Sequence, residues 1–338
     1  MHSHMQARRK RAVVVGAVLI LVCLSAVIVS LNTGSIRLAP AAVLRTLIGS
    51  GSPEDAMVLF EFRLPRIAVT LLAGFGLGVS GSILQGLSRN ALADPGILGI
   101  HAGASFGLIL FVTIFHSMDG LSSLLIPLFT FIGGALAALS IVMLAYERHR
   151  GLQPVRLILI GIAVAAGFSA VSLFLSLRLD QETYAFASRW LVGNVWGRDW
   201  VHAFALFPWI ALIVPYILFQ SKTLNAFTLG DELAIGIGSP VRRQRLVLLA
   251  MGVALSCASV SVAGGIGFIG LVAPHLARRL TGPMHQHFLP ISGLIGSIIL
   301  LAADTVGRSI FQPNAIPAGV VVAAVGAPYF LYLLRKTK

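Results

Sequence analysis

Residues 63–99, RLPRIAVTLLAGFGLGVSGSILQGLSRNALADPGILG, decide the fold class of this chain. Arg63 and Arg66 bracket a proline, and a nearly continuous apolar run follows that is long enough to cross a bilayer. The run ends in a polar break at residues 85–94, which a lipid-facing segment would not tolerate, and apolar sequence then resumes. This pattern predicts a membrane protein whose interior forms a path for a transported molecule.

The composition indicates an integral membrane protein. Of the 338 residues, 57% are hydrophobic and only 11% are charged, whereas a soluble domain carries about 25% charged residues. Long apolar segments predict helices rather than the short alternating strands of a barrel. Cys23 and Cys257 both fall inside apolar segments, so we expect no disulfide framework. The first apolar run follows ARRKR (7–11) without an Ala-x-Ala-like site, so we expect no cleavable signal peptide.

Ten segments are predicted to span the membrane, on the basis that about 20 apolar residues cross roughly 30 Å of hydrocarbon. They are residues 12–31, 64–84, 96–115, 124–145, 155–176, 200–219, 245–263, 264–277, 289–310 and 317–334. The eighth is short and glycine-rich. Counting it as a span keeps Arg278, Arg279 and the basic tail 335–338 on the same side as most other basic residues. The positive-inside rule then predicts that both termini are cytoplasmic.

Ten spans divide into two halves of five, and an odd number in each half makes the halves run in opposite directions. Residues 63–83 resemble residues 242–262, since both place arginines before a span rich in small residues. This resemblance fits an inverted repeat, which is common in transporters. The alternative is that two helices rich in small residues look alike because both pack tightly.

Basic residues on the predicted outer side are exceptions to the charge rule. Arg63 and Arg66 begin the second span, and Arg308 ends the ninth. Asp304 precedes Arg308 by four residues, so the two share a helix face and could simply pair. The functional alternative is that outward arginines attract an acidic ligand or the acidic surface of a docking protein. Asp304 lies toward the outer end of its span, which argues against coupling to an ion gradient.

The longest inner loop, residues 220–245, contains an amphipathic segment at 229–238 that is too short to span. It is either an interfacial helix or a surface for a cytoplasmic partner, and its composition favours the interfacial helix.

The chain contains no sequence of the form GxxxxGK[ST], and no lysine follows a glycine. It therefore cannot bind ATP through a P-loop, and ATP-driven transport would need a separate ATPase. Neither GxSxG nor HExxH occurs, which disfavours a membrane enzyme. His285 and His287 have no carboxylate or cysteine nearby in the sequence, so we expect no metal site.

Several long motifs occur in order along most of the chain: RLPR (63–66), SGSILQGLSRNALADPGILG (80–99), GGIGFIGLVAPHLARRLTG (264–282), LPISGLIGSIILLAADTVGR (289–308) and IPAGVVVAAVGAPYFLYLL (316–334). With these motifs the chain resembles the FecCD-type permeases, the membrane subunits of ABC importers for iron–siderophores, haem and vitamin B12. The resemblance implies an all-α, ten-helix type II ABC importer permease fold. It also implies two permease subunits, identical or homologous, two cytoplasmic ATPase subunits and an extracytoplasmic substrate-binding protein.

The resemblance assigns two sets of site residues. Arg63 and Arg308 match arginines that pair with acidic residues of the binding protein, and Arg66 matches the second arginine of RLPR. The ATPase-coupling loop reads LGDELAIGIG here, and the matching residues are Asp231, Glu232, Ala234 and Gly238. Aspartate replaces the family's glutamate at position 231 and keeps the charge. QPNA (312–315) lacks a glutamate often found before the next turn.

We therefore expect one transmembrane permease domain, residues 1–338, with a basic tail at 1–11 and the coupling loop at about 220–245. The expected cargo is an iron chelate, with a ferric siderophore preferred and haem or cobalamin as alternatives. ATP and Mg²⁺ would bind the partner ATPases, and no cofactor or nucleic acid is expected on this chain. We expect it in the bacterial cell membrane. The competing class is an ion-coupled secondary transporter.

Overall fold

The computed structural model describes residues 2–34, 38–96, 99–115, 122–147, 151–236, 240–310 and 315–336. In chain order its elements are α1 (His2–Asn32), α2 (Pro40–Leu47), α3 (Pro53–Met57), the π-helix η1 (Val58–Arg63), α4 (Leu64–Ser88), α5 (Ile100–Ile114), α6 (Ser122–Ala145), β1 (Tyr146–Glu147), β2 (Gly151–Leu152), α7 (Pro154–Ser176), α8 (Gln181–Leu191), α9 (Trp200–Phe219), α10 (Ser221–Thr228), α11 (Asp231–Gly236), α12 (Val241–Ala263), α13 (Ile269–Thr281), α14 (His285–Ser309) and α15 (Ala318–Lys336). β1 and β2, of two residues each, pair antiparallel.

A helix stands at each of the ten predicted spans. Among the described residues, eight helices are long and apolar enough to cross a membrane. The other two positions hold α5, with 15 residues, and α13, with 13. At a rise of about 1.5 Å per residue, these helices are about 20 Å long, which is less than the hydrocarbon thickness. The all-α membrane fold is therefore confirmed, while the count of ten complete spans stays a prediction.

The shortness of α13 has a local backbone cause. The predicted span began at Gly264, but α12 ends there and Gly264 has a φ of 81°. Phe268 also has a positive φ, 66°, and helix geometry begins only at Ile269. Positive φ values do not fit a right-handed helix, so the glycine-rich segment 264–268 is an irregular link at the head of α13.

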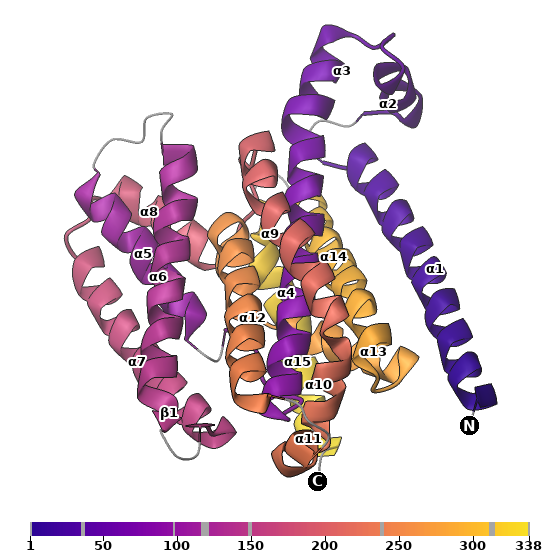
Figure 1. Cartoon of the computed structure of the whole chain (residues 1–338). Coiled ribbons are helices and arrows are strands. Elements are labelled where there is room, and N and C mark those ends of the chain that lie inside the picture. The colour runs from indigo at the N-terminus through magenta and orange to yellow at the C-terminus, as the bar shows by residue number, and fades with distance from the viewer. Residues whose placement is uncertain are drawn as a thin grey trace.

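The bundle has two distinct ends (Figure 1). The two termini, the β1–β2 hairpin and the α10–α11 pair lie at one end, and α2 and α3 lie at the other. Helices α5, α6 and α7 pack on one another at one side of the molecule. Helix α1 packs on α14 at the opposite side, and its most apolar stretch is not buried in the chain. We call the end with α11 the inner end and the end with α3 the outer end.

Helix α4 is the central element, and it contacts α12, α13 and α14. A Cβ atom added to Gly74, Gly78 or Gly81 would collide with the backbone of α14 or α13. Ser292 Oγ on α14 donates to the carbonyl of Gly78 at 2.8 Å. In lipid, where apolar burial gives little drive between helices, small residues and such hydrogen bonds hold helices together. The glycines of the opening stretch therefore serve packing.

The tight contact at Gly81 yields a prediction. Gly81→Ala should lower the thermal stability of the detergent-solubilised protein, because the new Cβ would meet the carbonyl of Gly270. Overpacking of this kind costs about 1–3 kcal/mol. Gly167→Ala is the matched control, since Gly167 lies in helix α7 and a Cβ there meets nothing within 4 Å. Equal unfolding temperatures for the two variants would contradict the close contact.

Candidate functional site

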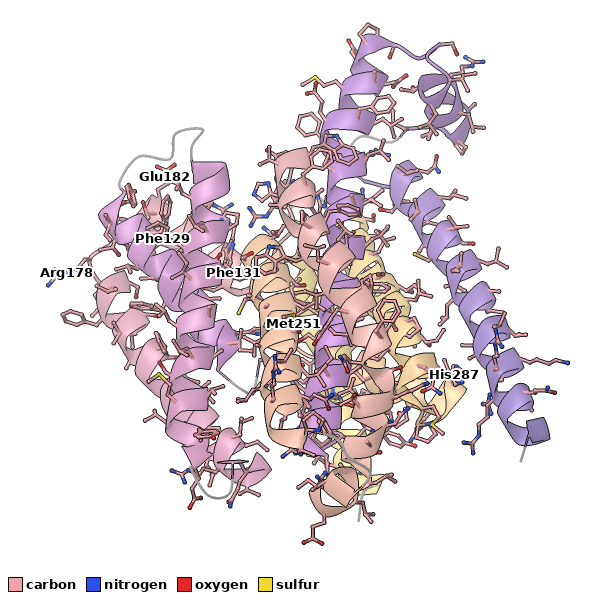
Figure 2. The ribbon with its side chains drawn as sticks, in the orientation of Figure 1. Phe129, Phe131, Arg178, Glu182, Met251 and His287 are labelled. Atoms are coloured by element: carbon pink, nitrogen blue, oxygen red, sulfur yellow. The ribbon has the colours of Figure 1, made fainter. Side chains whose placement is uncertain are left out.

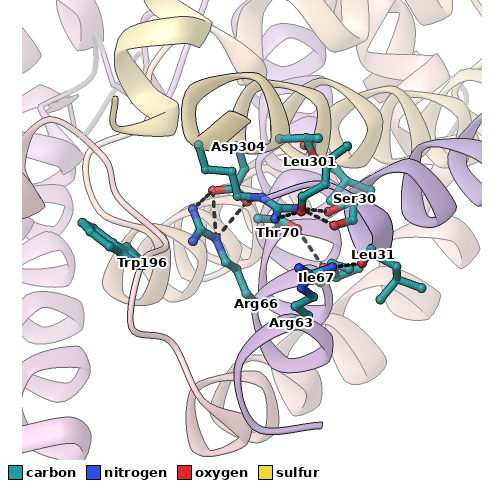
Figure 3. Close-up of polar contacts among 12 residues, drawn as sticks. Ser30, Leu31, Arg63, Arg66, Ile67, Thr70, Trp196, Leu301 and Asp304 are labelled. Carbon is teal, nitrogen blue, oxygen red and sulfur yellow. Dashed lines mark hydrogen bonds and ion pairs between the residues drawn. The ribbon is translucent and has the colours of Figure 1, made fainter. Parts of the chain in front are cut away.

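The three predicted docking arginines lie together at the outer end, around one cavity, and Figure 3 shows two of them, Arg63 and Arg66. Arg63 ends η1, Arg66 lies in the first turn of α4, and Arg308 lies in the last turn of α14. Arg63 and Arg308 are only 7% and 8% exposed. The side chain of Arg66 is 17% exposed. The three side chains are therefore parts of a packed cluster rather than free surface charges.

Asp304 of α14 is the counter-ion of this cluster, and it is 3% exposed. Arg66 binds its carboxylate in a bidentate way, with Nε donating to Oδ2 at 2.9 Å and Nη2 donating to Oδ1 at 2.6 Å. Nε of Arg308 lies 3.6 Å from Oδ2 of the same carboxylate. The four-residue spacing suggested a pair between Asp304 and Arg308. The structure places Asp304 between the two arginines, with its closest contacts to Arg66 on a different helix.

Arg63 and Arg308 also hold the end of α1. Arg63 Nη1 donates to the carbonyl of Leu31, and Arg308 donates to the carbonyls of Ser30 and Thr33. Arg308 Nη2 also donates to Ser30 Oγ at 2.6 Å. The last carbonyls of a helix lack partners within the helix, so these guanidinium groups cap α1 and fix it to the core. Reversing either charge would disturb α1 as well as any docking surface.

The cluster opens into a cavity of about 370 Å³, which we call the arginine cleft. Its lining includes the three arginines and a fourth, Arg198, from the segment between α8 and α9. The carboxylates of Glu61 and Asp199 also line it. With Asp304 included, four guanidinium groups stand against three carboxylates, so the cleft keeps a net positive charge that suits an anionic partner.

The sequence analysis missed Arg198. Its Nη1 donates to Nε2 of His202 at 3.3 Å, and Nδ1 of His202 lies 2.6 Å from Oδ1 of Asp199. Asp199 also caps the N-terminus of α9 by accepting from the backbone N–H of His202 at 3.2 Å. Burial lowers the pKa of Arg198 to about 10, which leaves it charged at neutral pH. The Asp-x-x-His pattern at 199–202 was the available signal, but it predicts only a helix cap.

At the inner end the predicted coupling loop forms two short helices, α10 and α11. Glu232 is exposed on α11 and Ala234 is fully buried beneath it. Asp231 is the first residue of α11, but the structure does not describe its side chain. Gly238 lies outside the described residues. The large apolar side chains Leu229, Leu233 and Ile235 are 62–63% exposed here. Exposed apolar residues grouped in this way fit either a protein partner or the membrane interface.

Helix α10 is fixed to the core helices on both sides. Arg89, the C-cap residue of α4, donates from Nε to the carbonyl of Phe227 at 2.8 Å. Oδ1 of Asn225 accepts from the backbone N–H of His285 at 2.9 Å and lies 2.8 Å from its Nδ1. Met284, the N-cap residue of α14, makes no side-chain cap, so Asn225 caps α14 from another helix. The segment that leads to α11 is therefore attached to α4 and α14.

Comparison with known proteins identifies the group to which these features belong. A model of the FecCD transport family matches residues 19–336. The chain belongs to the FecCD transport family. It is 44% identical over 336 residues to the iron(3+)-hydroxamate import system permease protein FhuG of Bacillus subtilis, covering 98% of this chain and 99% of the relative. It is 37% identical to the Fe(3+) dicitrate transport system permease protein FecD of Escherichia coli, over 84% of this chain and 87% of the relative.

Solved structures agree with this assignment. A structure described as an inward-facing conformation of a metal-chelate type ABC transporter matches with a TM-score of 0.82 and 30% identity, covering 94% of this chain and 97% of that one. PsaBC from Streptococcus pneumoniae, in complex with Fab, matches with a TM-score of 0.60 at 18% identity, over 86% and 94% of the two chains, which supports the fold alone. The fold is the type II ABC importer permease fold. This FecCD-family chain is a transport subunit, and the ATPase is a separate subunit.

The buried counter-ion yields a second prediction. Asp304→Asn would leave Arg66 and Arg308 buried without their carboxylate. Breaking a buried pair in this way costs about 3–5 kcal/mol, so the unfolding temperature in detergent should fall clearly. Glu54→Gln, an exposed amide replacement on α3 at the same end, is the control. An unchanged unfolding temperature for Asp304→Asn would refute the structural role of the carboxylate.

Proposed function

We propose that this chain is the membrane-spanning subunit of an ABC importer that carries a ferric chelate into the cytoplasm. The main support for the proposal is that two candidate partner surfaces lie at opposite ends of the helix bundle. An arginine-lined cleft lies at the outer end, and an exposed apolar helix lies at the inner end. A binding protein with acidic side chains would suit the first, and an ATPase subunit would suit the second.

The names of relatives support a ferric chelate as cargo. The relatives include permeases named for iron(3+)-hydroxamate, Fe(3+)-citrate and ferric enterobactin. These chelators differ in chemistry, while Fe³⁺ is common to all of them. The proposal therefore commits to ferric chelates as a class, and haem or cobalamin are the alternatives within the same type of importer.

The coupling pathway that we propose begins at Asp231, Glu232 and Ala234 of α11 and includes Gly238, which follows α11 in the sequence. Movement of the ATPase subunits would displace this segment. Because α10 is attached to α4 by Arg89 and to α14 by Asn225, the displacement would reach both helices. Helices α4 and α14 are in turn joined by Arg66 and Asp304 at the outer end. The result would be alternating access, with the bundle open to one side at a time.

The proposed orientation places α11 and both termini in the cytoplasm and the arginine cleft outside, in a bacterial cell membrane. The chain would function with a second permease subunit, two ATPase subunits and a binding protein. Arg63, Arg66 and Arg308 would attract acidic side chains of the binding protein. Of the three, Arg66 is the most exposed, and it could exchange Asp304 for a carboxylate of the partner.

The proposed function is tested by uptake of radiolabelled iron chelate into proteoliposomes that contain the assembled transporter and its binding protein. Uptake should require ATP and should stop when the ATPase subunits cannot hydrolyse it. Glu232→Lys should lower uptake by about tenfold, because charge reversal at an exposed interface weakens association. Glu182→Lys, exposed on α8 near the outer end (Figure 2), is the control. Full uptake with an ATPase that cannot hydrolyse ATP would refute the proposal.

The docking role is tested by the affinity of the binding protein for the transporter in lipid nanodiscs. Arg66→Gln should weaken docking by about tenfold, and salt should weaken the wild-type complex because it screens the attraction between oppositely charged protein surfaces. Arg45→Gln is the control, since Arg45 is exposed on α2 at the same end but does not line the cleft. Equal affinity for wild type and Arg66→Gln would remove Arg66 from the docking surface.

A further inference from the structure

A second cavity, of about 280 Å³, adjoins the arginine cleft between α8 and the segment that leads to α9. We call it the aromatic pocket, and it is lined by Phe186, Arg189, Trp190, Asn194, Trp196, Gly197 and Arg198. Its lining combines three aromatic side chains with two guanidinium groups and includes no carboxylate. Trp196, Gly197 and Arg198 also line the arginine cleft, so the two cavities share one wall.

Two buried donors in this lining lack acceptors. Nε1 of Trp190, a residue only 3% exposed, and Nε of Arg198 have no hydrogen-bond partner among the described residues. Indole and guanidinium nitrogens can donate but cannot accept. A buried donor without a partner costs about 1–3 kcal/mol. A ligand that supplies oxygen acceptors would remove this cost, and a cationic ligand would not.

Arg198 is held in place before any ligand arrives. Because the guanidinium can only donate, Nε2 of His202 must accept, and the ring proton then lies on Nδ1 and is donated to Asp199. His202 is 3% exposed, so this arrangement is enclosed. The contact uses Nη1 of Arg198, while its buried Nε has no partner among the described residues. A side chain fixed in this way loses little conformational freedom on binding.

The backbone of the pocket is equally constrained. A Cβ on Gly264 would approach the carbonyl of Trp190 at 2.5 Å, and one on Gly265 would approach that of Leu191 at 2.6 Å. The backbone N–H of Gly319 donates to the carbonyl of Gly193 at 3.0 Å. The glycine-rich segment 264–268 and the start of α15 therefore support the end of α8. The pocket is a preformed feature of the fold.

We propose that the aromatic pocket binds an anionic, oxygen-rich group of the transported chelate as the chelate leaves the binding protein. This inference rests on the proposed function and names a substrate subsite within it. The guanidinium groups and the indole N–H match anionic oxygens, and the aromatic rings offer flat surfaces for a planar carboxylate or catecholate group. An acidic side chain of a partner would need only arginines, which the arginine cleft already provides. The pocket therefore selects chelates with negative charge over neutral ones.

The test uses two synthetic probes with the same tripodal backbone, a trianionic ferric tricatecholate and a neutral ferric trihydroxamate, both labelled with radioactive iron. Binding is measured at equilibrium on the assembled transporter in lipid nanodiscs without binding protein. The tricatecholate should bind about tenfold more tightly than the trihydroxamate, and Arg198→Gln should abolish most of this difference. Arg198→Lys, which keeps the charge, should retain part of it.

Trp196→Ala provides a second variant that does not depend on folding, because the side chain of Trp196 is 57% exposed. It should weaken tricatecholate binding by several-fold through the loss of one aromatic surface. Arg178→Gln is the control, since Arg178 is an exposed residue just beyond the end of α7 and points away from the bundle (Figure 2). Its affinity for both probes should equal that of the wild type.

Equal affinity for the two probes, or an unchanged preference in Arg198→Gln, would overturn the inference. The proposed function fails separately, through the uptake assay. If the transporter distinguishes the two probes but shows no ATP-dependent uptake, the pocket inference stands and the proposed function is refuted. If uptake depends on ATP but the two probes bind equally, the proposed function stands and the pocket inference is refuted.

Discussion

The close backbone contact between α4 and α14 is the interaction on which the rest of the structure depends. Glycines on both helices, including Gly74, Gly78 and Gly296, let the two backbones touch. Serine hydroxyls bridge the same contact, with Ser297 Oγ donating to the carbonyl of Leu71 at 2.7 Å. Since lipid is as apolar as a leucine side chain, burial alone would not hold these helices together. Their contact geometry does so, and it keeps the two helices from moving independently.

This pair connects both ends of the molecule. At the outer end Arg66 of α4 binds Asp304 of α14, and at the inner end Arg89 of α4 and His285 of α14 both bind α10. Helix α14 has 25 residues, about 37 Å at the usual helical rise. A displacement at α11 would therefore reach the arginine cleft through two helices that are fixed to each other.

The sequence predicted the positions of the helices well, because the hydropathy of consecutive residues is enough to locate membrane-spanning segments. It could not predict the partner of Asp304, since the spacing to Arg308 offered a local pair and Arg66 lies on a distant segment. Arg198 was missed for the same reason: its role depends on the buried His202 and on the end of α8, which meet it only in the fold. The short α13 reflects two positive φ values that apolar composition does not reveal.

The buried carboxylates agree with the proposed use of ATP rather than an ion gradient as the energy source. Two aspartates are buried within the described residues, Asp94 and Asp304. Asp94 accepts from the backbone N–H of Gly96 in a turn at 2.9 Å, and Asp304 is bound by Arg66. A carrier coupled to protons or sodium needs a carboxylate that gains and loses its ion near the middle of the membrane. Both aspartates have structural partners, which agrees with the proposal that the work of transport enters through the surface at α11.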